Sequence, residues 1–489
     1  MPPFLPPALP WAKALAYPAL EFGPLQLPIL SGALPPSLQG SLYRNGPGRL
    51  ERGGQQVGHW FDGDGAVLRI HFGSQNSQQS QATGLYRFVK THGYQVESQQ
   101  DRFLYGGYGM TPPGPLWQRW GRMVKNAANT SVLALNDRLL ALWEAGSPHQ
   151  LDLETLDTVG LADLGGTLPE GQPYSAHPKR DPHTGEIFNF GVQIGRRTLL
   201  KLYVSDPQGH IQRQATIPLT GIPLIHDCVL AGSYWVFCIP PVRLNLWPVA
   251  AGWQSYSDSL QWKPHLGTEI LIVDRQSLEV VARRETDPWF QWHFANGFVD
   301  QQGDICIDVV KYGDFATNDY LAQVPSGITS THAPGYLNRL RLDAATAKVL
   351  SVDPLIPHPC EFPTLAAAEV GHPHQSLYVL THRPGADGVR DLFGAIGCLD
   401  LSAGDPRRQS FVLRDLGPNR YPSEPIFAPD PSQPGQGWLL TIVFDGNCNS
   451  SEVWIFAAHQ LQEDPVCRLG LPSVVPHSFH GTWCPSPNH

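Results

Sequence analysis

Ile270-Leu-Ile-Val-Asp-Arg-Gln-Ser-Leu-Glu-Val-Val281 is the stretch that decides the fold of this 489-residue chain. An aliphatic run leads into a polar Asp-Arg-Gln-Ser segment, and a second aliphatic run follows. This pattern predicts a strand, a tight turn and a returning strand. Segments of the same kind recur at residues 66–72, 150–164, 200–218, 270–284, 340–352, 397–414 and 453–469.

Repetition of one hairpin unit is typical of radially arranged sheets. The sequence therefore predicts an all-β fold, a seven-bladed β-propeller, with loops and short helices forming a cap over its axis. The units are unevenly spaced, so the connecting loops must differ in length, and loops are where function tends to lie. We expect a single domain over residues 31–489, preceded by a proline-rich amino-terminal extension over residues 1–30.

Composition excludes several classes of function. Charged residues make up 16% of the chain, the formal net charge is −9, and no cluster of Lys and Arg is present, which disfavours a nucleic-acid partner. The eight cysteines contain no Cys-x-x-Cys pair, which argues against a zinc knuckle and a disulfide framework. The segment 1–31 is broken by prolines and has one basic residue, Lys13, unlike a secretory signal. We expect a cytoplasmic protein.

Four histidines lie in short apolar or aromatic settings: His177 in Ser-Ala-His-Pro, His226 in Ile-His-Asp, His293 in Trp-His-Phe-Ala-Asn, and His480 in Phe-His-Gly-Thr-Trp. A neutral imidazole offers one lone pair to a metal while an acceptor holds its other ring nitrogen. The pattern suggests an all-histidine metal site. A single histidine beside an aromatic residue is more often a hydrogen-bonded core residue, and 19 histidines give many ways to choose four.

Three glutamates could supply the acceptors. Glu144, Glu361 and Glu424 are isolated acids in apolar or proline-rich runs. An unpaired carboxylate is costly in such surroundings, so each is expected to have a partner.

The segment 115–126 predicts a short amphipathic helix. Its apolar residues recur at three- and four-residue spacing, with Arg119, Arg122 and Lys125 between them; they are Leu116, Trp117, Trp120, Met123 and Val124. Trp and Arg in this arrangement favour a helix that touches a membrane surface. The alternative is a helix packed on the face of the propeller. Leu244–Pro248 could add a second apolar loop or belong to the core.

The chain also resembles a known family. Leu34-Pro-Pro-Ser-Leu-Gln-Gly-Ser-Leu-Tyr-Arg-Asn-Gly-Pro-Gly48 and Trp60-Phe-Asp-Gly-Asp-Gly-Ala66 are similar to the opening signature of the carotenoid cleavage oxygenases. Further motifs match in order: residues 126–130, 139–146, 170–178, 225–227, 293–296, 423–427 and 476–483. The similarity covers nearly the whole chain and is strongest to the cyanobacterial, apocarotenoid-cleaving members.

The resemblance implies a propeller that holds ferrous iron, Fe²⁺, on its axis. His177, His226, His293 and His480 would be the ligands. Glu144 would orient His226, Glu361 would orient His293, Glu424 would orient His480, and His177 would lack a carboxylate partner. Thr130 matches a position whose side chain closes off one coordination site. Imidazole also suits zinc and copper, so the choice of iron comes from the family.

The implied reaction is oxidative scission by O2 of a carbon-carbon double bond in a carotenoid or apocarotenoid, at the central 15,15′ bond, giving retinal-like aldehydes. Such a substrate requires an apolar tunnel, which aromatic residues could line: Phe61, Trp143, Trp292, Phe294, Tyr312 and Phe362. For each of these, ordinary core packing is the alternative. A lipid-soluble substrate also implies peripheral contact with a membrane, with the apolar face of residues 116–124 as the entrance.

Three other interpretations compete. A stilbene-cleaving member of the family would have a lysine just before the first of the three glutamates, where this chain has Trp143. An isomerohydrolase belongs to longer chains in a retinoid setting. A metal-free propeller could serve as a protein-interaction scaffold, but it would have no reason to carry three isolated buried glutamates.

Overall fold

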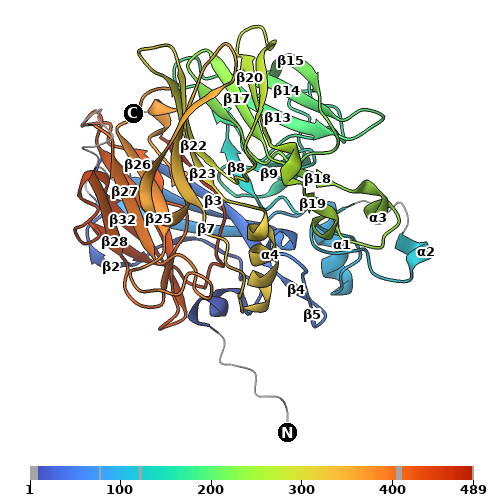
Figure 1. Ribbon diagram of the computed structural model, residues 1–489. Coiled ribbons are helices and arrows are strands. Elements are labelled where there is room, and N and C mark those ends of the chain that lie inside the picture. Colours follow the sequence, from blue (N-terminus) through green and yellow to red (C-terminus); the bar gives the residue numbers. More distant parts are fainter. Residues whose placement is uncertain (1–8, 76–78, 120–123, 403–409, 487–489) are drawn as a thin grey trace.

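The computed structural model describes residues 9–75, 79–119, 124–402 and 410–486. Antiparallel strands dominate these ranges, and short helices lie at one end and along the edges (Figure 1). The strands form seven antiparallel sheets, numbered here in the order in which they pack. Sheet 1 contains β1 (Phe22–Gln26), β7 (Gln79–Phe88), β6 (Asp64–Gln75), β3 (Gly40–Arg49) and β34 (Gly481–Pro485).

Sheets 2, 3 and 4 follow along the chain. Sheet 2 contains β8 (Ser131–Ala134), β9 (Leu139–Leu142), β10 (His149–Leu151) and β11 (Thr158–Leu161). Sheet 3 contains β12 (Lys179–Arg180), β13 (Ile187–Gln193), β14 (Leu199–Ser205) and β15 (Ile211–Pro218). Sheet 4 contains β16 (Val229–Ala231), β17 (Tyr234–Ile239), β20 (Thr268–Asp274) and β21 (Val280–Thr286).

Sheets 5 and 6 share the long strand β25 (Val349–Thr364), which pairs with β24 along its first part and with β26 along its last. Sheet 5 contains β22 (Phe294–Val299), β23 (Ile305–Lys311) and β24 (Tyr336–Leu342), and sheet 6 contains β26 (Ser376–Thr381), β27 (Ala395–Asp400) and β28 (Ser410–Asp415). Sheet 7 contains β2 (Ile29–Gly32), β33 (Cys467–Gly470), β32 (Ser450–Ala457), β31 (Gly437–Asp445), β29 (Arg420–Pro422) and β30 (Ile426–Pro429).

The remaining elements are short. Two small hairpins pair β4 (Glu51–Arg52) with β5 (Gln55–Gln56) and β18 (Val242–Leu244) with β19 (Leu260–Trp262). The α-helices are α1 (His92–Gln100), α2 (Leu116–Arg119), α3 (Leu246–Ala250) and α4 (Ala316–Gln323). The 3-10 helices are η1 (Pro10–Leu15), η2 (Trp60–Asp62), η3 (Ser257–Ser259), η4 (Pro264–Leu266), η5 (Val324–Ser326), η6 (Ala367–Glu369) and η8 (Ala458–Gln460).

Six of the seven predicted hairpins are confirmed as antiparallel pairs, each in a different sheet. They are β10/β11, β14/β15, β20/β21, β24/β25, β27/β28 and β32/β33. In the Ile270 stretch, the Asp274 carboxylate accepts hydrogen bonds from the backbone N–H groups of Gln276 and Ser277 and so closes the turn. The seventh segment, 66–72, lies within the single strand β6, and its returning strand is β7.

Alternation along β20 shows how the sheets pack. Ile270 and Ile272 face a cluster shared with sheet 5, whereas Leu271 and Val273 face a cluster shared with sheet 3. Successive side chains of a strand point to opposite faces, so a strand that is apolar on both faces must be covered on both. Each inner strand of this kind is therefore packed between two neighbouring sheets.

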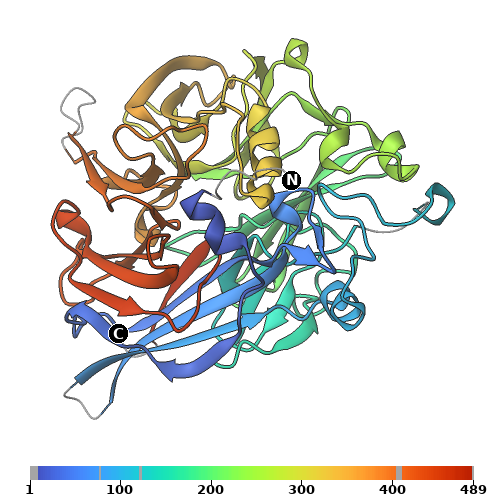
Figure 2. The same ribbon diagram turned by 90° about the horizontal axis from the view of Figure 1, so that it is seen from below.

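The apolar clusters form a closed cycle. Separate clusters join sheets 1 and 2, 2 and 3, 3 and 4, 4 and 5, 5 and 6, and 6 and 7, and a further cluster joins sheet 7 back to sheet 1. In Figure 2 the colours of the ribbon accordingly run in sequence order around the middle of the molecule. The two ends of the chain meet in this cycle, because β34 pairs with β3 and β2 pairs with β33.

The described part of the amino-terminal segment packs against the sheets and pairs with two of them. Trp11 in η1 is fully buried beside Phe444, β1 pairs with β7, and β2 pairs with β33. The expected boundary between residues 30 and 31 falls inside β2. Apolar side chains between the prolines explain this packing, since they can be buried without forming a long helix.

The predicted amphipathic helix is shorter than expected. Its described helical part, α2, spans Leu116–Arg119, and Trp120 and Met123 lie outside the described residues. Val124 is half-buried and forms a parallel bridge with Gly106, which gives it a backbone role in place of a position on an exposed apolar face.

Candidate metal centre

The four predicted histidine ligands come from four different sheets and meet at the middle of the molecule. His177 precedes β12, His226 precedes β16, His293 precedes β22 and His480 precedes β34. Each of these strands ends the strand order of its sheet, so each histidine enters at the start of an edge strand. The three predicted glutamates come from the other three sheets: Glu144 follows β9, Glu361 lies in β25 and Glu424 precedes β30.

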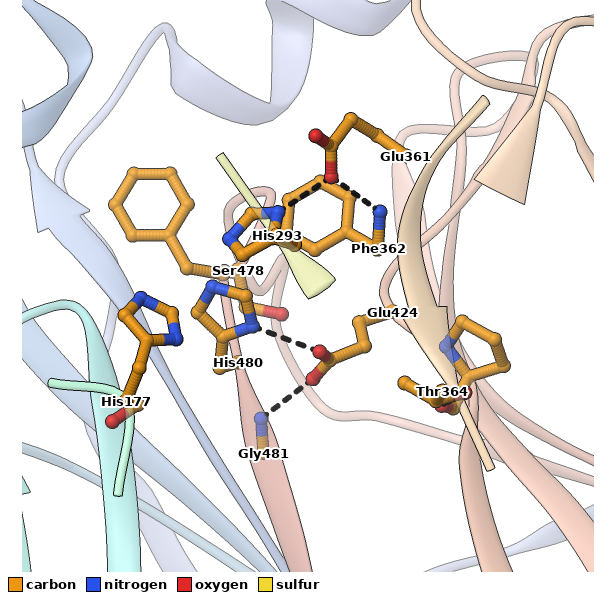
Figure 3. Close-up of polar contacts among 12 residues, drawn as sticks. His177, His293, Glu361, Phe362, Thr364, Glu424, Ser478, His480 and Gly481 are labelled. Atoms are coloured by element: carbon orange, nitrogen blue, oxygen red, sulfur yellow. Dashed lines mark hydrogen bonds and ion pairs between the residues drawn. The ribbon is translucent and has the colours of Figure 1, made fainter. Parts of the chain in front are cut away.

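The imidazole rings are close enough to share a metal ion. Ring centroids lie 4.3 Å apart for His177 and His226, 4.8 Å for His177 and His480, and 4.7 Å for His293 and His480. Candidate ligand atoms of His177, His226 and His293 all lie within 4.8 Å of one another. Figure 3 shows His177, His293 and His480 gathered on one side of the two glutamates that face them.

The positions of the ring nitrogens are better explained by a shared metal ion than by hydrogen bonds between the rings. The Nε2 atoms of His226 and His293 are 3.3 Å apart. The Nε2 atom of His177 is buried and has no hydrogen-bond partner among the described residues. Buried polar atoms are normally satisfied. Four neutral imidazoles are a donor set suited to iron, copper or zinc.

Glu361 holds His293 firmly. Its Oε2 atom lies 2.5 Å from His293 Nδ1 and accepts the backbone N–H of Phe362 at 2.6 Å (Figure 3). Its Oε1 atom accepts the Tyr312 hydroxyl at 3.0 Å. The carboxylate is buried, with 8% of the side chain exposed. Because the Nδ1 atom of His293 faces the acid, its Nε2 atom remains free for a metal.

Glu424 holds His480 in the same way. Its Oε1 atom lies 2.8 Å from His480 Nδ1, and its Oε2 atom accepts the backbone N–H of Gly481 at 2.9 Å (Figure 3). Arg44, which is 1% exposed, lies 3.9 Å from that second oxygen and donates to the carbonyl groups of Glu424 and Phe479. The guanidinium therefore joins the acid to the segment that carries its histidine.

Glu144 is placed less tightly. Its Oε1 atom lies 3.3 Å from His226 Nδ1 and 3.6 Å from His177 Nε2, and it makes no hydrogen bond among the described residues. About a quarter of this side chain, 26%, is exposed. His177, expected to lack a carboxylate partner, makes no hydrogen bond to Glu144 through Nε2 but lies within ion-pair range of it.

Burial and the neighbouring charges set the protonation of the histidines. Burial holds the pKa of His177 well below its usual range, and the adjacent His226 and His480 add to the effect. Burial also lowers the pKa of His480, against the opposing influence of Glu424. Burial alone would lower the pKa of His293, but the Glu361 carboxylate outweighs it and raises that pKa. Depressed pKa values favour the neutral imidazole that metal ligation needs.

Phe362 combines backbone strain with a place in the site. Its φ is 52°, in the left-handed region that a bulky side chain rarely adopts. The pairing of β25 with β26 shifts between Glu361 and Thr364, so the strand bulges here. The bulge directs the Glu361 carboxylate and the Phe362 ring to the same side, where the ring stacks on His293 with centroids 5.5 Å apart. Strain of this kind persists where the surroundings enforce it.

A largely apolar cavity opens onto the histidines. Phe61, Trp292, Tyr312 and Phe362, four of the six predicted tunnel residues, line it, and so does Thr130. Leu321, Leu392, Phe393 and Phe479 extend its apolar wall. The polar groups His332 and His382 also lie on the wall. An apolar cavity with a few convergent polar groups is the usual form of a small-molecule site.

Two predicted tunnel residues lie elsewhere. Phe294 is buried in the cluster between sheets 4 and 5 and borders a second cavity, because successive residues of a strand face opposite sides and its neighbour His293 points to the metal centre. Trp143 is half-buried and contributes to neither cavity wall. Its ring lies against Gly146, close to the turn that follows β9.

Two charged groups beside the site were not singled out from the sequence: Arg44 binds the Glu424 segment, and Asp227 binds the backbone next to His293. Tyr312, predicted as a tunnel residue, has a further contact, because its hydroxyl donates to Glu361. Arg44 and Asp227 are charged residues inside apolar motifs, and a charge in such a setting is also what identified the three glutamates. A search of the same motifs for every charged residue would have found Arg44 and Asp227.

Comparison with known proteins agrees with this geometry. The family model described as retinal pigment epithelial membrane protein, RPE65, matches residues 17–485. The chain belongs to this family. The apocarotenoid-15,15′-oxygenase of Synechocystis sp. is 34% identical to it, over 93% of this chain and 92% of the relative. Resveratrol cleavage oxygenase 1 of Aspergillus fumigatus is 26% identical, over 92% and 91% of the two chains.

Solved structures of family members also match. The crystal structure of cobalt-substituted Synechocystis ACO aligns with a TM-score of 0.87 and 32% identity, covering 98% of each chain. That relative is described as cobalt-substituted, which agrees with the cluster of histidines in this chain that could hold a metal ion. The predicted membership in the carotenoid oxygenase family is confirmed.

Proposed function

We propose that this protein is an iron(II)-dependent dioxygenase that cleaves a carbon-carbon double bond of an apocarotenoid or carotenoid, at the central 15,15′ bond, to give retinal-like aldehydes. The observation that carries the proposal is the convergence of four histidines beside an apolar cavity. His226, His293 and His480 lie on its wall, and the ring of His177 lies 4.3 Å from that of His226 and 4.8 Å from that of His480. The similarity to an apocarotenoid-15,15′-oxygenase supports the substrate and the bond.

We propose that the seven sheets are the blades of a seven-bladed β-propeller. The closed cycle of apolar clusters supports this, because each sheet is covered by the next and sheet 7 is covered by sheet 1. The pairing of β34 with β3 closes the ring with strands from both ends of the chain. We further propose that residues 31–489 are one domain, to which the described part of segment 1–30 is joined through β1 and β2.

The chain's own residues would hold the metal and keep its surroundings fixed. The four imidazoles would be the ligands, and Glu361, Glu424 and Glu144 would orient His293, His480 and His226. Four neutral ligands leave the charge of the metal uncompensated, and ferrous iron bound there would supply the activation of dioxygen. Thr130 lies on the cavity wall and would restrict access to one side of the centre.

The cavity would position the polyene and exclude water from it. Trp292 packs edge-on against His226, with centroids 4.8 Å apart, and Phe61 packs edge-on against Trp292 at 5.6 Å. These rings form a continuous apolar wall that leads to the metal centre. Oxidative scission needs correct placement of the double bond and no separate protein acid or base, which agrees with a wall of aromatic groups.

We propose that the protein is cytoplasmic and touches a membrane at one surface to take up its apolar substrate. The short helices α2 and α3 lie at the same edge of the molecule (Figure 1). Exposed apolar side chains gather on α2 and on the loop around α3, and the Arg119 guanidinium joins these elements by a hydrogen bond to the Gly252 carbonyl. The exposed residues are Leu116, Trp117, Leu246, Trp247 and Trp253. Burial of each such side chain in lipid contributes about 1.5–3 kcal/mol, which allows reversible attachment. No helix among the described residues is long and apolar enough to span a membrane.

Product analysis tests the proposed reaction. Purified protein is loaded with ferrous iron, mixed with an apocarotenal in detergent under air, and followed by visible absorbance, chromatography and mass spectrometry. Loss of polyene absorbance together with a retinal-sized aldehyde, both absent in a His226→Ala variant, is the expected result. Iron-loaded protein that leaves the polyene intact would contradict the proposal.

Stilbene cleavage is a second candidate, favoured by the similarity to a resveratrol cleavage oxygenase. Resveratrol incubated in parallel decides between the two. The apolar residues that surround the metal centre favour the polyene, so the expected outcome is faster turnover of the apocarotenal. Phenolic aldehydes formed from resveratrol at the higher rate would reverse the assignment.

A further inference from the structure

Asp227 is a buried carboxylate whose two oxygens bind groups from three separate segments. Only 1% of the residue is exposed. Its Oδ1 atom accepts the backbone N–H of Cys228 at 2.7 Å and lies 2.8 Å from the ammonium group of Lys179, and its Oδ2 atom accepts the backbone N–H of Phe294 at 2.9 Å. A buried carboxylate persists when it is paired and hydrogen-bonded in this way.

Every one of these partners lies next to a histidine of the metal centre. Asp227 directly follows His226, Phe294 directly follows His293, and Lys179 lies two residues after His177. Lys179 and Phe294 begin β12 and β22, and Cys228 directly precedes β16; these are the edge strands of sheets 3, 5 and 4. One carboxylate therefore ties together the three segments that present three of the four imidazoles.

The link that Asp227 makes between the three segments can keep the histidine side chains close together. The Nε2 atoms of His226 and His293 lie 3.3 Å apart. When the proton of each ring is on the Nδ1 atom that faces a carboxylate, both Nε2 atoms are acceptors and their lone pairs repel. Each segment would relax outward unless something held it. Hydrogen bonds to backbone groups are suited to this, because they fix the strand that carries the side chain and not just the ring.

We propose that Asp227, neutralised by Lys179, is a positioning residue that holds His177, His226 and His293 in the arrangement needed to bind the metal. This inference rests on the proposed metal-dependent function. Asp227 does not itself reach the metal: both its oxygens are committed to the three groups named above. The contact of Asp227 with Lys179 is expected to contribute less than its contacts with the backbone, since Lys179 binds one oxygen and is 22% exposed.

The chemistry of the carboxylate makes the proposal specific. An asparagine has the same shape but presents one acceptor and one NH2 donor. In an Asp227→Asn variant, the NH2 group must face either the N–H of Phe294 or the N–H of Cys228 and the ammonium of Lys179. Two donors that face each other repel, so at least one of the three segments is released.

Cobalt binding to the metal-stripped, full-length protein tests the inference. The variants are Asp227→Asn and Lys179→Met. The matched control is Asp308→Asn, which removes another fully buried carboxylate; that carboxylate is paired with Arg339 and His374 and not with a segment that carries one of the four histidines. The dissociation constant of Co²⁺ is measured by titration, the visible ligand-field spectrum reports the geometry of the centre, and the melting temperature of the metal-free protein reports stability.

Asp227→Asn is expected to weaken Co²⁺ binding by about 10-fold or more and to change the ligand-field spectrum, and Lys179→Met to do the same to a smaller extent. Asp308→Asn is expected to lower the melting temperature without either change. If Asp227→Asn lowers the melting temperature and leaves Co²⁺ affinity and spectrum as in the wild type, the aspartate is merely structural and the inference is overturned. Should Asp227→Asn fail to fold, Lys179→Met decides on the same two measurements.

The result also separates this inference from the proposed reaction. Weakened cobalt binding in the variants, combined with iron-loaded wild-type protein that cleaves no double bond, would support the positioning role and contradict the function. Wild-type protein that takes up no cobalt would overturn the metal centre and the positioning role together.

Discussion

Two sides of the metal centre differ in how their histidines are held. On one side, Glu361 and Glu424 are buried, approach His293 and His480 to 2.5 and 2.8 Å, and also bind backbone N–H groups. On the other side, Glu144 is a quarter exposed and lies 3.3 Å from His226 without a hydrogen bond among the described residues. The tight side is fixed ring by ring.

The histidines of the loose side are held through the residues next to them. Asp227, which follows His226, binds the ammonium of Lys179, two residues after His177, and the N–H group of Phe294, which follows His293 on the tight side. It therefore joins strands and not rings. Ring orientation on this side is left to packing, for example of Trp292 against His226. A carboxylate near a ligand histidine can therefore orient the imidazole ring itself or hold the backbone segment that carries it. The two roles require different tests.

The largest effect is expected from removal of an imidazole on the tight side. In His293→Ala, the Glu361 carboxylate loses its histidine and stays buried, so both metal binding and folding suffer. Metal content by elemental analysis and polyene cleavage should fall by about 100-fold or more. Wild-type metal content in this variant would remove His293 from the ligand set.

A pair of glutamine variants tests whether Glu361 holds its histidine more tightly than Glu144 does. Glu361→Gln should weaken Co²⁺ binding by about 10- to 100-fold, because it disturbs a buried acceptor of three hydrogen bonds. Glu144→Gln should have a clearly smaller effect, since its carboxylate is partly solvated. Titration of both variants under one set of conditions gives the answer, and equal losses would erase the distinction between the two sides.

A smaller loss of Co²⁺ affinity is expected from a change at Tyr312, which contacts Glu361 and not a histidine. Tyr312→Phe removes the hydroxyl that donates to Glu361 at 3.0 Å and should cost about 0.5–1.5 kcal/mol, seen as a modest loss of Co²⁺ affinity. Tyr378→Phe is the control, because its buried hydroxyl donates to the Ala458 carbonyl, away from the histidines. If both variants bind Co²⁺ equally well, Tyr312 does not support the tight side.

The smallest effect on the centre is expected from the apolar surface. Replacement of Leu116 and Trp117 with serine should leave Co²⁺ affinity unchanged and reduce association with liposomes in a flotation assay. A matched change at Val159 and Leu161, exposed on β11, controls for general loss of surface hydrophobicity. Unaltered flotation of the first variant would remove α2 from the membrane surface.

Much of the fold could be read from local sequence. Six hairpins follow from the same pattern, apolar run, polar turn and apolar run, because turn chemistry and strand alternation act over a few residues. The position of the segment before residue 31 could not be predicted from its own residues. Its strands β1 and β2 pair with β7 and β33, which lie far away in the chain, and such pairing has no signal in the local sequence.

The sequence by itself singled out four histidines and three glutamates as candidates, because a polar or charged side chain inside an apolar motif is costly to bury unless it has a partner. Only the tertiary structure decided how they are shared: that Glu144 lies near His177 as well as His226, that Phe294 and Trp143 turn away from the cavity, and that Asp227 spans three strands. Distances across a ring of sheets depend on how each sheet packs on the next, and no local pattern contains them.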